Sequence, residues 1–236
     1  MAGNTHIGET NGVLLALLPE QRRRLLAHSE QVNLATGDVL GEPGKPMRHV
    51  YFPNNGIISL LNPVDRHASV EVGLVGREGM AGMGLFLGAS VSSFRMLVQA
   101  SGTAARMMAV SFRNELRRNP SLRKELNKYL YVFMAQVAQT AACNRRHQLG
   151  PRLARRLLMT LDRVQSNEFE LTQEMLANIL GVRRVGVAKA AALLQKSNLI
   201  RYSRGHITII DRKGLVRASC WCYGAVNDIR DTVFGW

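Results

Sequence analysis

The segment 171–197 constrains the fold of this chain more than any other, because a glycine interrupts it between two helical stretches. Thr172 is a residue type that caps helix N-termini, so a first helix is expected to begin there. Gly181 stands where that helix must end in a tight turn, and a second helix is expected from about Arg183 to Lys196. Two helices joined by so short a turn must cross and pack against each other.

Small and apolar residues occupy the positions at which these two helices would meet. The apolar ones are Leu176, Leu180, Val182, Val187 and Ala190. Ala177 is small where larger side chains would collide, and glycine follows it four residues later. This pattern resembles a helix-turn-helix. A plain αα-hairpin inside a helical domain is the alternative interpretation.

A short hairpin is expected directly after the second helix. Leu199–Tyr202 and His206–Ile210 have the composition of strands, and Ser203-Arg204-Gly205 joins them with a basic tip. A helix-turn-helix followed by such a hairpin is a winged helix. In that arrangement the second helix enters the DNA major groove and the hairpin, the wing, lies along the backbone.

The face of the second helix opposite Val187 and Ala190 is expected to contact bases. Its residues are Arg183, Arg184, Val185 and Lys189. Arg184 is the candidate for a bidentate contact to guanine, and Val185 for contact with a thymine methyl group. Lys189 is expected to reach a base or a phosphate. The alternative is that the two arginines are simply solvated.

Phosphate contacts are expected from residues around this face. Thr172, Gln173 and the free N–H groups at the start of the first helix suit a phosphate. Arg204 and His206 in the wing are expected to add affinity for any DNA sequence.

Charge is distributed very unevenly along the chain, whose net charge is +14. Residues 1–112 carry nine Lys and Arg against eight Asp and Glu, whereas residues 113–236 carry twenty-two against nine. The second half is therefore suited to bind polyanions. Specific DNA recognition and non-specific DNA coating both fit this surplus. Attachment to an anionic membrane is less well supported, because residues 151–164 only partly resemble an amphipathic surface helix.

The first half has a different texture. Residues 12–30 predict two short helices broken at Pro19, with Leu25 and Leu26 facing inward. From Val32 to about Val110, short β-branched and aromatic segments alternate with turn signals, which predicts an all-β sandwich or barrel. The pair Asn55-Gly56 is expected to form a hairpin turn.

A long helix is expected between the two halves, from Ser121 to about His147, since Asn119-Pro120 is a helix start and no Gly or Pro follows. Steps of four and three residues make one stripe along it. The stripe consists of Leu126, Leu130, Phe133, Val137, Thr140 and Asn144. It is expected to be a dimer seam, assisted by small residues at Ala135, Ala138, Ala141 and Ala142. Packing on the chain's own β domain is the alternative. After Gly150-Pro151 another helix is expected to bury its leucines and expose Arg152, Arg155 and Arg156.

This order of elements resembles the Crp/Fnr superfamily of bacterial transcription regulators. The resemblance covers roughly residues 13–215 and is most specific over 171–210. It implies an α+β chain with a double-stranded β-helix (jelly-roll) sensor domain at residues 1–112. It further implies a long dimerisation helix at 113–149 and a winged helix-turn-helix DNA-binding domain at 150–236. The implied partners are a second copy of the chain, a roughly two-fold symmetric DNA site and RNA polymerase.

The effector side of the resemblance is incomplete. Cyclic-nucleotide members of the superfamily hold the ribose with a Gly-Glu pair, but Gly82 stands where that glutamate is expected. Gly84 belongs to the same stretch, Glu78 is acidic but out of register, and Arg95 is the candidate for the phosphate-binding arginine. Met96-Leu97 follow that arginine in place of the usual small residues. Binding of cAMP is therefore not expected, and no cofactor is predicted.

The three cysteines do not predict a disulfide framework, and none lies near the N-terminus, which argues against the iron–sulfur chemistry of the oxygen-sensing branch. Cys220 and Cys222 form a C-x-C pair without an evident second pair or histidine, so buried thiols are expected and no metal site is predicted; a metal or redox role is the alternative. No haem ligand can be placed. No catalytic motif is present, so an enzyme is not expected. With no signal peptide or spanning segment, a cytoplasmic location is expected.

Overall fold

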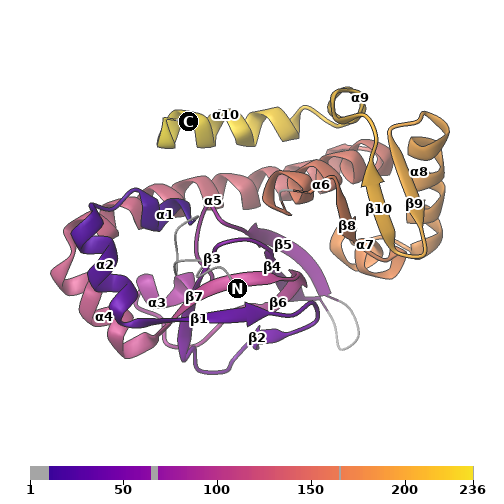
Figure 1. Ribbon diagram of the computed structural model, residues 1–236. Helices are drawn as coiled ribbons and strands as arrows, with labels where there is room; N and C mark the ends of the chain where they lie inside the picture. The colour runs from indigo at the N-terminus through magenta and orange to yellow at the C-terminus, as the bar shows by residue number, and fades with distance from the viewer. Residues whose placement is uncertain (1–10, 65–68, 165, 236) are drawn as a thin grey trace, which may run out of the picture. The chain divides into compact units, whose positions relative to one another are not determined.

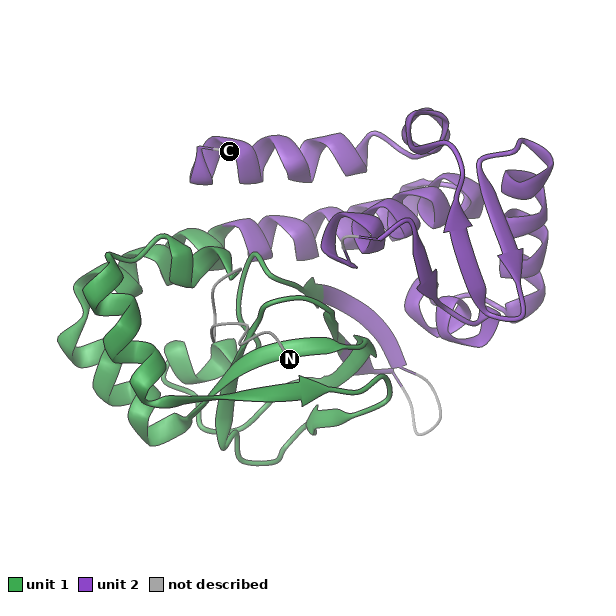
Figure 2. Cartoon of the chain, viewed as in Figure 1, with its two compact units in different colours: residues 1–60, 74–131 green, residues 61–73, 132–236 purple. Residues whose placement is uncertain are grey.

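The computed structural model describes residues 11–64, 69–164 and 166–235 (Figure 1). The chain divides into two compact units, residues 1–60 with 74–131 and residues 61–73 with 132–236 (Figure 2). Strands dominate the middle of the first half and helices the second, so the predicted α+β class is confirmed. Among the described residues, no helix combines the length and the apolar character needed to cross a membrane.

The first unit begins with two short helices, α1 (Gly12–Leu15) and α2 (Pro19–Ala27), as predicted. The side chain of Asn11 caps α1, because its Oδ1 accepts a hydrogen bond from the Leu14 N–H at 3.3 Å. Leu25 is fully buried, as expected. Leu26 is only half-buried.

Two sheets form the β-rich part, consistent with a jelly-roll. In the first sheet β7 lies between β1 and β3 and pairs antiparallel with both, from Ser29 opposite Met107 and from His49 opposite Met108. The second sheet has the order β2-β6-β4-β5. The strands are β1 (Ser29–Leu34), β2 (Val39–Gly41), β3 (His49–Pro53), β4 (Ile57–Pro63), β5 (Ser69–Val75), β6 (Arg95–Ala100) and β7 (Gly102–Met108). The helices α3 (Met83–Phe86) and α4 (Ala109–Arg118) complete this region.

The predicted hairpin turn at Asn55-Gly56 is wrong. This turn connects β3 to β4, and the two strands belong to different sheets. Gly56 has φ +81°, and a Cβ there would lie 2.7 Å from the Ala100 carbonyl oxygen. The Asn55 Oδ1 accepts a hydrogen bond from the Thr103 N–H at 2.7 Å. The residue pair therefore serves a sharp corner between sheets, which needs the same left-handed glycine as a hairpin.

The long helix α5 (Pro120–Arg146) begins where predicted, and the Asn119 Oδ1 caps it by accepting from the Leu122 N–H at 3.0 Å. The predicted seam is wrong in part, because Leu126 and Phe133 are buried within the chain itself. The ring of Phe133 lies directly against Gly73 of β5. The apolar residues that α5 exposes are instead Tyr131 and Met134, each 62% exposed, followed by the exposed small residues. These are Ala138, Ala141 and Ala142.

The second unit contains a helical core and a small sheet. Its helices are α6 (Leu149–Val164), α7 (Gln173–Leu180), α8 (Arg184–Lys196), α9 (Arg212–Ala218) and α10 (Cys222–Phe234). Its sheet has the order β8-β10-β9, with β8 (Glu168–Glu170), β9 (Ile200–Ser203) and β10 (His206–Ile209). The leucines of α6 that were expected to be buried, Leu153, Leu157, Leu158 and Leu161, are buried, and both α8 and α9 pack on this helix.

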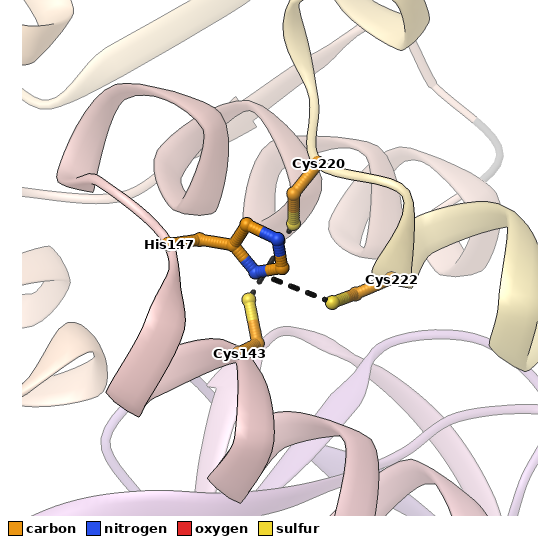
Figure 3. A group of neighbouring side chains, drawn as sticks. All are labelled: Cys143, His147, Cys220 and Cys222. Carbon is orange, nitrogen blue, oxygen red and sulfur yellow. Dashed lines mark hydrogen bonds between the residues drawn. The ribbon is translucent and has the colours of Figure 1, made fainter.

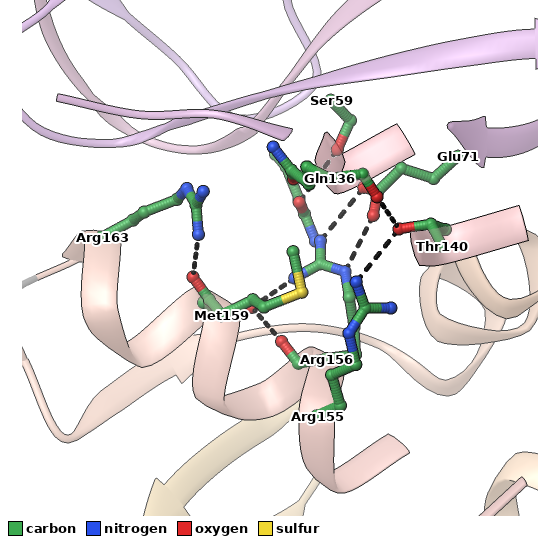
Figure 4. A network of polar contacts seen from close by, with 10 residues as sticks. Ser59, Glu71, Gln136, Thr140, Arg155, Arg156, Met159 and Arg163 are labelled. Carbon is green, nitrogen blue, oxygen red and sulfur yellow. Dashed lines mark hydrogen bonds and ion pairs between the residues drawn. The ribbon is translucent and has the colours of Figure 1, made fainter. Parts of the chain in front are cut away.

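Two of the three α6 arginines that were predicted to face solvent are buried, and the third, Arg152, is half-buried and donates to the Leu180 carbonyl. Arg155 and Arg156 are 5% and 4% exposed. The Arg156 guanidinium makes two bonds with the Glu71 carboxylate of β5, Nε to Oε1 at 2.9 Å and Nη2 to Oε2 at 3.1 Å (Figure 4). Arg155 donates to the Thr140 hydroxyl of α5 at 3.1 Å. The spacing of these arginines suggests a solvated helix face. They are buried instead in a polar network, because the Glu71 carboxylate and the Thr140 hydroxyl lie opposite them.

Candidate nucleic-acid interface

The turn between α7 and α8 has the geometry predicted from the sequence. The Thr172 hydroxyl accepts a hydrogen bond from the Met175 N–H at 3.1 Å and so caps α7. Gly181 ends α7 with φ +62° and ψ +43°, a left-handed conformation that costs glycine little. Ala177 is 4% exposed where the helices meet. These contacts fix the direction in which the next helix leaves.

The recognition candidate α8 is buried on one face and exposed on the other. Its inner face packs through fully or almost fully buried residues, namely Val187, Ala190, Ala191 and Leu194. A Cβ at Gly186 would lie 3.1 Å from the Leu149 side chain of α6, so the two helices approach closely. The predicted base-contacting residues are all at least partly exposed. They are Arg183, Arg184, Val185 and Lys189. Leu193, 65% exposed, extends this face and was missed by the sequence reasoning.

The predicted wing is present as β9 and β10, which pair antiparallel with Ser203 opposite His206. The connecting turn has two residues, Arg204 with φ +50° and Gly205 with φ +88°, so both occupy the left-handed region. Arg204 is exposed at the tip. The third strand, β8, was not predicted, because its three residues are too few to give a periodic signal. Because β8 brings Glu170 beside the wing, the His206 Nε2 lies 3.4 Å from a Glu170 carboxylate oxygen.

A hollow lies where α7, the start of α8 and the wing meet. Its lining comprises Thr172, Gln173, Glu174, Arg184, Tyr202, Arg204 and Gly205, so it unites four of the predicted contact residues. Tyr202 supports this hollow: its hydroxyl donates to the Leu171 carbonyl at 2.7 Å, and its N–H donates to the Gln195 Oε1 at 2.6 Å. Burial raises the pKa of Tyr202 to about 12. The tyrosine therefore stays neutral and holds the wing against α7 and α8.

A second group of functional side chains was not predicted. Cys143, His147, Cys220 and Cys222 place their ligand atoms within 4.8 Å of one another (Figure 3). The expectation that no histidine lies near the C-x-C pair is wrong, since the His147 Nδ1 is 3.5 Å from the Cys222 sulfur. A hydrogen bond from the Cys220 thiol lowers the pKa of Cys143, against the effect of burial, and raises that of Cys220. The fold joins Cys143 to Cys220 across 77 positions of sequence, a separation that local spacing cannot reveal.

Comparison with known proteins agrees with this geometry. Residues 151–218 match the Crp-like helix-turn-helix domain. FixK2 from Bradyrhizobium japonicum has a similar fold, with a TM-score of 0.69 at 11% identity over 81% of this chain and 98% of that one. The c-di-GMP responsive global regulator CLP of Xanthomonas campestris gives 0.67 at 16% identity over 81% and 99%. A CRP/FNR-family transcriptional regulator of Thermus thermophilus gives 0.65 at 22% identity over 80% and 98%. None of the curated protein sequences matches this chain.

Residues 151–218 thus carry a Crp-like helix-turn-helix domain, and the chain as a whole has the fold of these solved regulators.

The residues predicted for a Crp/Fnr effector pocket lie in the first unit, where each has local contacts of its own. Gly82 precedes α3 with φ +92°, and a Cβ there would lie 3.0 Å from the His49 carbonyl oxygen. Glu78 accepts from the Gly76 N–H at 3.2 Å. Arg95 is exposed and lies 3.5 Å from the Glu42 carboxylate. The backbone therefore demands glycine at the position where cyclic-nucleotide members carry the ribose-binding glutamate.

Gly84, the fourth predicted pocket residue, lies within α3. A Cβ there would lie 2.6 Å from the end of the Met47 side chain. This glycine is therefore covered by apolar packing, and it has no side chain to present to a ligand.

Proposed function

We propose that this protein is a DNA-binding transcription regulator that acts as a homodimer and reads one DNA sequence by inserting α8 into the major groove. The observation that carries the proposal is the two-sided character of α8. Val187 and Ala190 are buried against the domain core, while Arg184, Val185 and Lys189 project from the opposite face. A helix held rigidly by one face and carrying arginine on the other is suited to base recognition.

Individual roles follow from chemistry and position. Arg184 contacts the O6 and N7 of a guanine, Val185 packs on a thymine methyl group, and Lys189 reaches a base or a phosphate. Arg183 precedes the first turn of α8 and contacts the DNA backbone. The open hollow around Thr172 accommodates a phosphate between the start of α7 and the wing.

Phosphate binding is shared among groups on α7 and the wing. The Thr172 hydroxyl accepts from Met175 and still has its own proton to donate. Gln173 supplies a side-chain amide at the start of α7. Arg204 at the wing tip and His206 contribute affinity without sequence preference. Glu170 beside His206 moderates this contribution, because a carboxylate repels the DNA backbone.

Dimerisation is assigned to the exposed face of α5. Tyr131 and Met134 expose large apolar surface one turn apart, and Ala138 and Ala141 continue the same face with small side chains. Residues three and four apart lie on one side of a helix, and small residues permit close approach of a second helix. Two copies joined in this way would present their α8 helices to a two-fold symmetric site.

The remaining assignments rest on the superfamily. We assign residues 1–112 to sensing, 113–149 to dimerisation and 150–236 to DNA binding, with contact to RNA polymerase and a cytoplasmic location. The effector is not cAMP, because Gly82 cannot be exchanged for a glutamate without strain and a steric conflict with His49. The chain has no catalytic role in this proposal.

The alternative function is non-specific DNA coating through the basic half. The two are distinguished by selecting bound duplexes from a random pool with purified protein at moderate salt and no added ligand. Enrichment of a two-fold symmetric site supports the proposal. If no sequence is enriched with or without cyclic nucleotides, while binding remains strongly salt-dependent, the coating function is correct.

Two arginine variants then separate base reading from phosphate contact. Arg184→Ala is expected to weaken binding to the selected site by ~1–3 kcal/mol, roughly 5- to 150-fold, and to relax preference at one base pair. Arg204→Ala is the matched control and is expected to weaken all sequences alike and to reduce the salt dependence by about one ion. An equal loss on every sequence after Arg184→Ala would disprove its base-reading role.

A further inference from the structure

We propose that Cys143, His147, Cys220 and Cys222 form a mononuclear zinc site that fastens the C-terminal helix α10 to the end of α5. The four residues come from two places in the second unit. Cys143 lies in the last turn of α5, and His147 directly follows the helix, with its N–H donating to the Cys143 carbonyl at 3.0 Å. Cys220 and Cys222 flank the junction between α9 and α10.

The distances match those that a tetrahedral zinc ion requires. The Cys143 and Cys220 sulfurs are 3.4 Å apart, and the Cys222 sulfur is 3.5 Å from the His147 Nδ1. With Zn–S bonds of about 2.3 Å, tetrahedral geometry places two ligand sulfurs roughly 3.8 Å apart. All four ligand atoms lie within 4.8 Å of one another (Figure 3). Small side-chain shifts are therefore sufficient to admit the ion.

The backbone around the C-x-C pair is arranged to aim both sulfurs inward. Cys220 and Cys222 are 7% and 0% exposed, whereas Trp221 between them is 76% exposed. The indole, a large apolar group, is thus left in solvent while two thiols are buried. Hydrophobic burial alone would favour the opposite arrangement, since a thiol buries far less apolar surface than an indole. Ligation of a metal by the two sulfurs accounts for it.

Neighbouring side chains complement the charge of such a site. Three thiolates, one neutral imidazole and one Zn²⁺ carry a net charge of minus one. The positive charge of Arg155 interacts with Cys143, and that of Arg152 with both Cys143 and Cys220. Gln139 donates from Nε2 to the Cys222 sulfur at 2.9 Å. Hydrogen bonds and charges of this kind orient metal ligands and tune their affinity.

The ligand set and its compactness select zinc among the metals. Three cysteines with one histidine are a usual ligand set of structural zinc sites. A [2Fe–2S] or [4Fe–4S] cluster would interpose iron and sulfide and spread its cysteine sulfurs farther than these atoms are spread. Four protein ligands leave no open position, so the site is structural in character and not catalytic.

The site has a defined structural consequence. The Crp-like domain ends at residue 218, and α10 lies beyond it. Few residues of α10 are buried, namely Cys222, Tyr223 and Ala225. Zinc would join this helix to α5, in addition to its packing on α6, where the Tyr223 hydroxyl donates to the Asp162 carboxylate at 2.8 Å. This inference is independent of how α8 reads DNA.

The test uses the full-length protein, purified with its thiols reduced. Elemental analysis is expected to find about one zinc ion per chain, and exchange for Co²⁺ to give the visible absorption of a tetrahedral ion with thiolate-to-cobalt charge transfer. Cys222→Ser and His147→Gln are expected to lose the zinc. His28→Gln, which changes an exposed histidine after α2, is the matched control and keeps it.

A further variant tests the site without touching a ligand or the fold. Gln139→Ala removes only the hydrogen bond to the Cys222 sulfur and is expected to lower metal affinity roughly 10- to 100-fold. Circular dichroism verifies that each variant is folded. The cobalt spectrum is measured on the unaltered protein, so that test does not depend on the folding of any variant. Absence of zinc together with absence of a tetrahedral cobalt spectrum would overturn the proposal. So would full zinc retention by folded Cys222→Ser, or the finding of iron with inorganic sulfide.

Discussion

Replacing Glu71 by glutamine removes the negative charge that neutralises a buried arginine and keeps the size of the side chain. The side chains of Arg156 and Glu71 are 5% and 7% exposed, and two hydrogen bonds join them. Burial lowers the pKa of Arg156, and the charge of Glu71 opposes that effect. Glu71→Gln therefore leaves the guanidinium buried without its counter-charge.

The magnitude follows from the geometry of the pair. Removing one partner of a buried ion pair costs ~3–5 kcal/mol. The glutamine oxygen can still accept one hydrogen bond, so we expect the lower end, about 3 kcal/mol. Replacing both Glu71 and Arg156 by methionine removes the buried positive charge together with its counter-charge. Such exchanges are neutral or stabilising by ~1–4 kcal/mol in other proteins. The double variant is thus expected to be more stable than Glu71→Gln alone.

The assay is equilibrium urea unfolding followed by tryptophan fluorescence. Trp221 lies in the unit that contains the pair, so its signal reports on the unfolding of that unit. With a denaturant dependence of about 2 kcal/mol per molar, a loss of about 3 kcal/mol lowers the midpoint by roughly 1.5 M. Glu30→Gln, in an exposed pair with Arg106, is the control and is expected to cost no more than about 1 kcal/mol.

Two outcomes would refute this reasoning. A Glu71→Gln protein within about 1 kcal/mol of the unaltered one would mean that water or another group compensates Arg156. A double methionine variant no more stable than the single variant would mean that packing, and not the unpaired charge, determines the loss.

Two further predictions concern the dimer and the wing. Met134→Asp places a charge on the exposed face of α5 and is expected to convert the dimer to a monomer, as measured by light scattering coupled to gel filtration. The control is Met108→Asp on β7, a similarly exposed position, which is expected to leave the mass unchanged. A dimeric Met134→Asp protein would show that another surface is used. For Tyr202 the folded pKa of about 12 exceeds the unfolded value of 10, so its contribution to stability is complete below pH 10 and is lost as the pH rises toward 12. Urea unfolding of Tyr202→Phe is expected to lack this part of the alkaline loss, and identical pH profiles of the two proteins would contradict it.

The winged helix-turn-helix was predictable because its signals are local. Thr172 and Gly181 act on the backbone within a few residues, and Val187 and Ala190 alternate with Arg184 and Lys189 at helical spacing. The same locality made the strands of the first half predictable, but not their partners. Asn55-Gly56 was identified correctly as a turn and wrongly as a hairpin, because the sequence does not state which strands pair across a turn.

Contacts between residues distant in sequence determine which side chains are buried, and local sequence patterns predicted this wrongly at several positions. Arg155 and Arg156 look like solvent-facing residues until Glu71 and Thr140 are placed beside them. Leu126 and Phe133 belong to a regular stripe along α5 that was predicted to be a dimer seam. A helix of this length can bury only part of its surface in its own chain, and these two residues lie in that buried part.

The winged helix-turn-helix of this protein follows from local signals, because helix caps, turn glycines and helical periodicity act over a few residues. The exposure of Tyr131 and Met134 on α5, and the meeting of Cys143 and His147 with Cys220 and Cys222, depend instead on long-range packing. A cluster of side chains from distant segments has no local signature, since its members acquire a shared chemistry only when the folded backbone brings them within bonding distance.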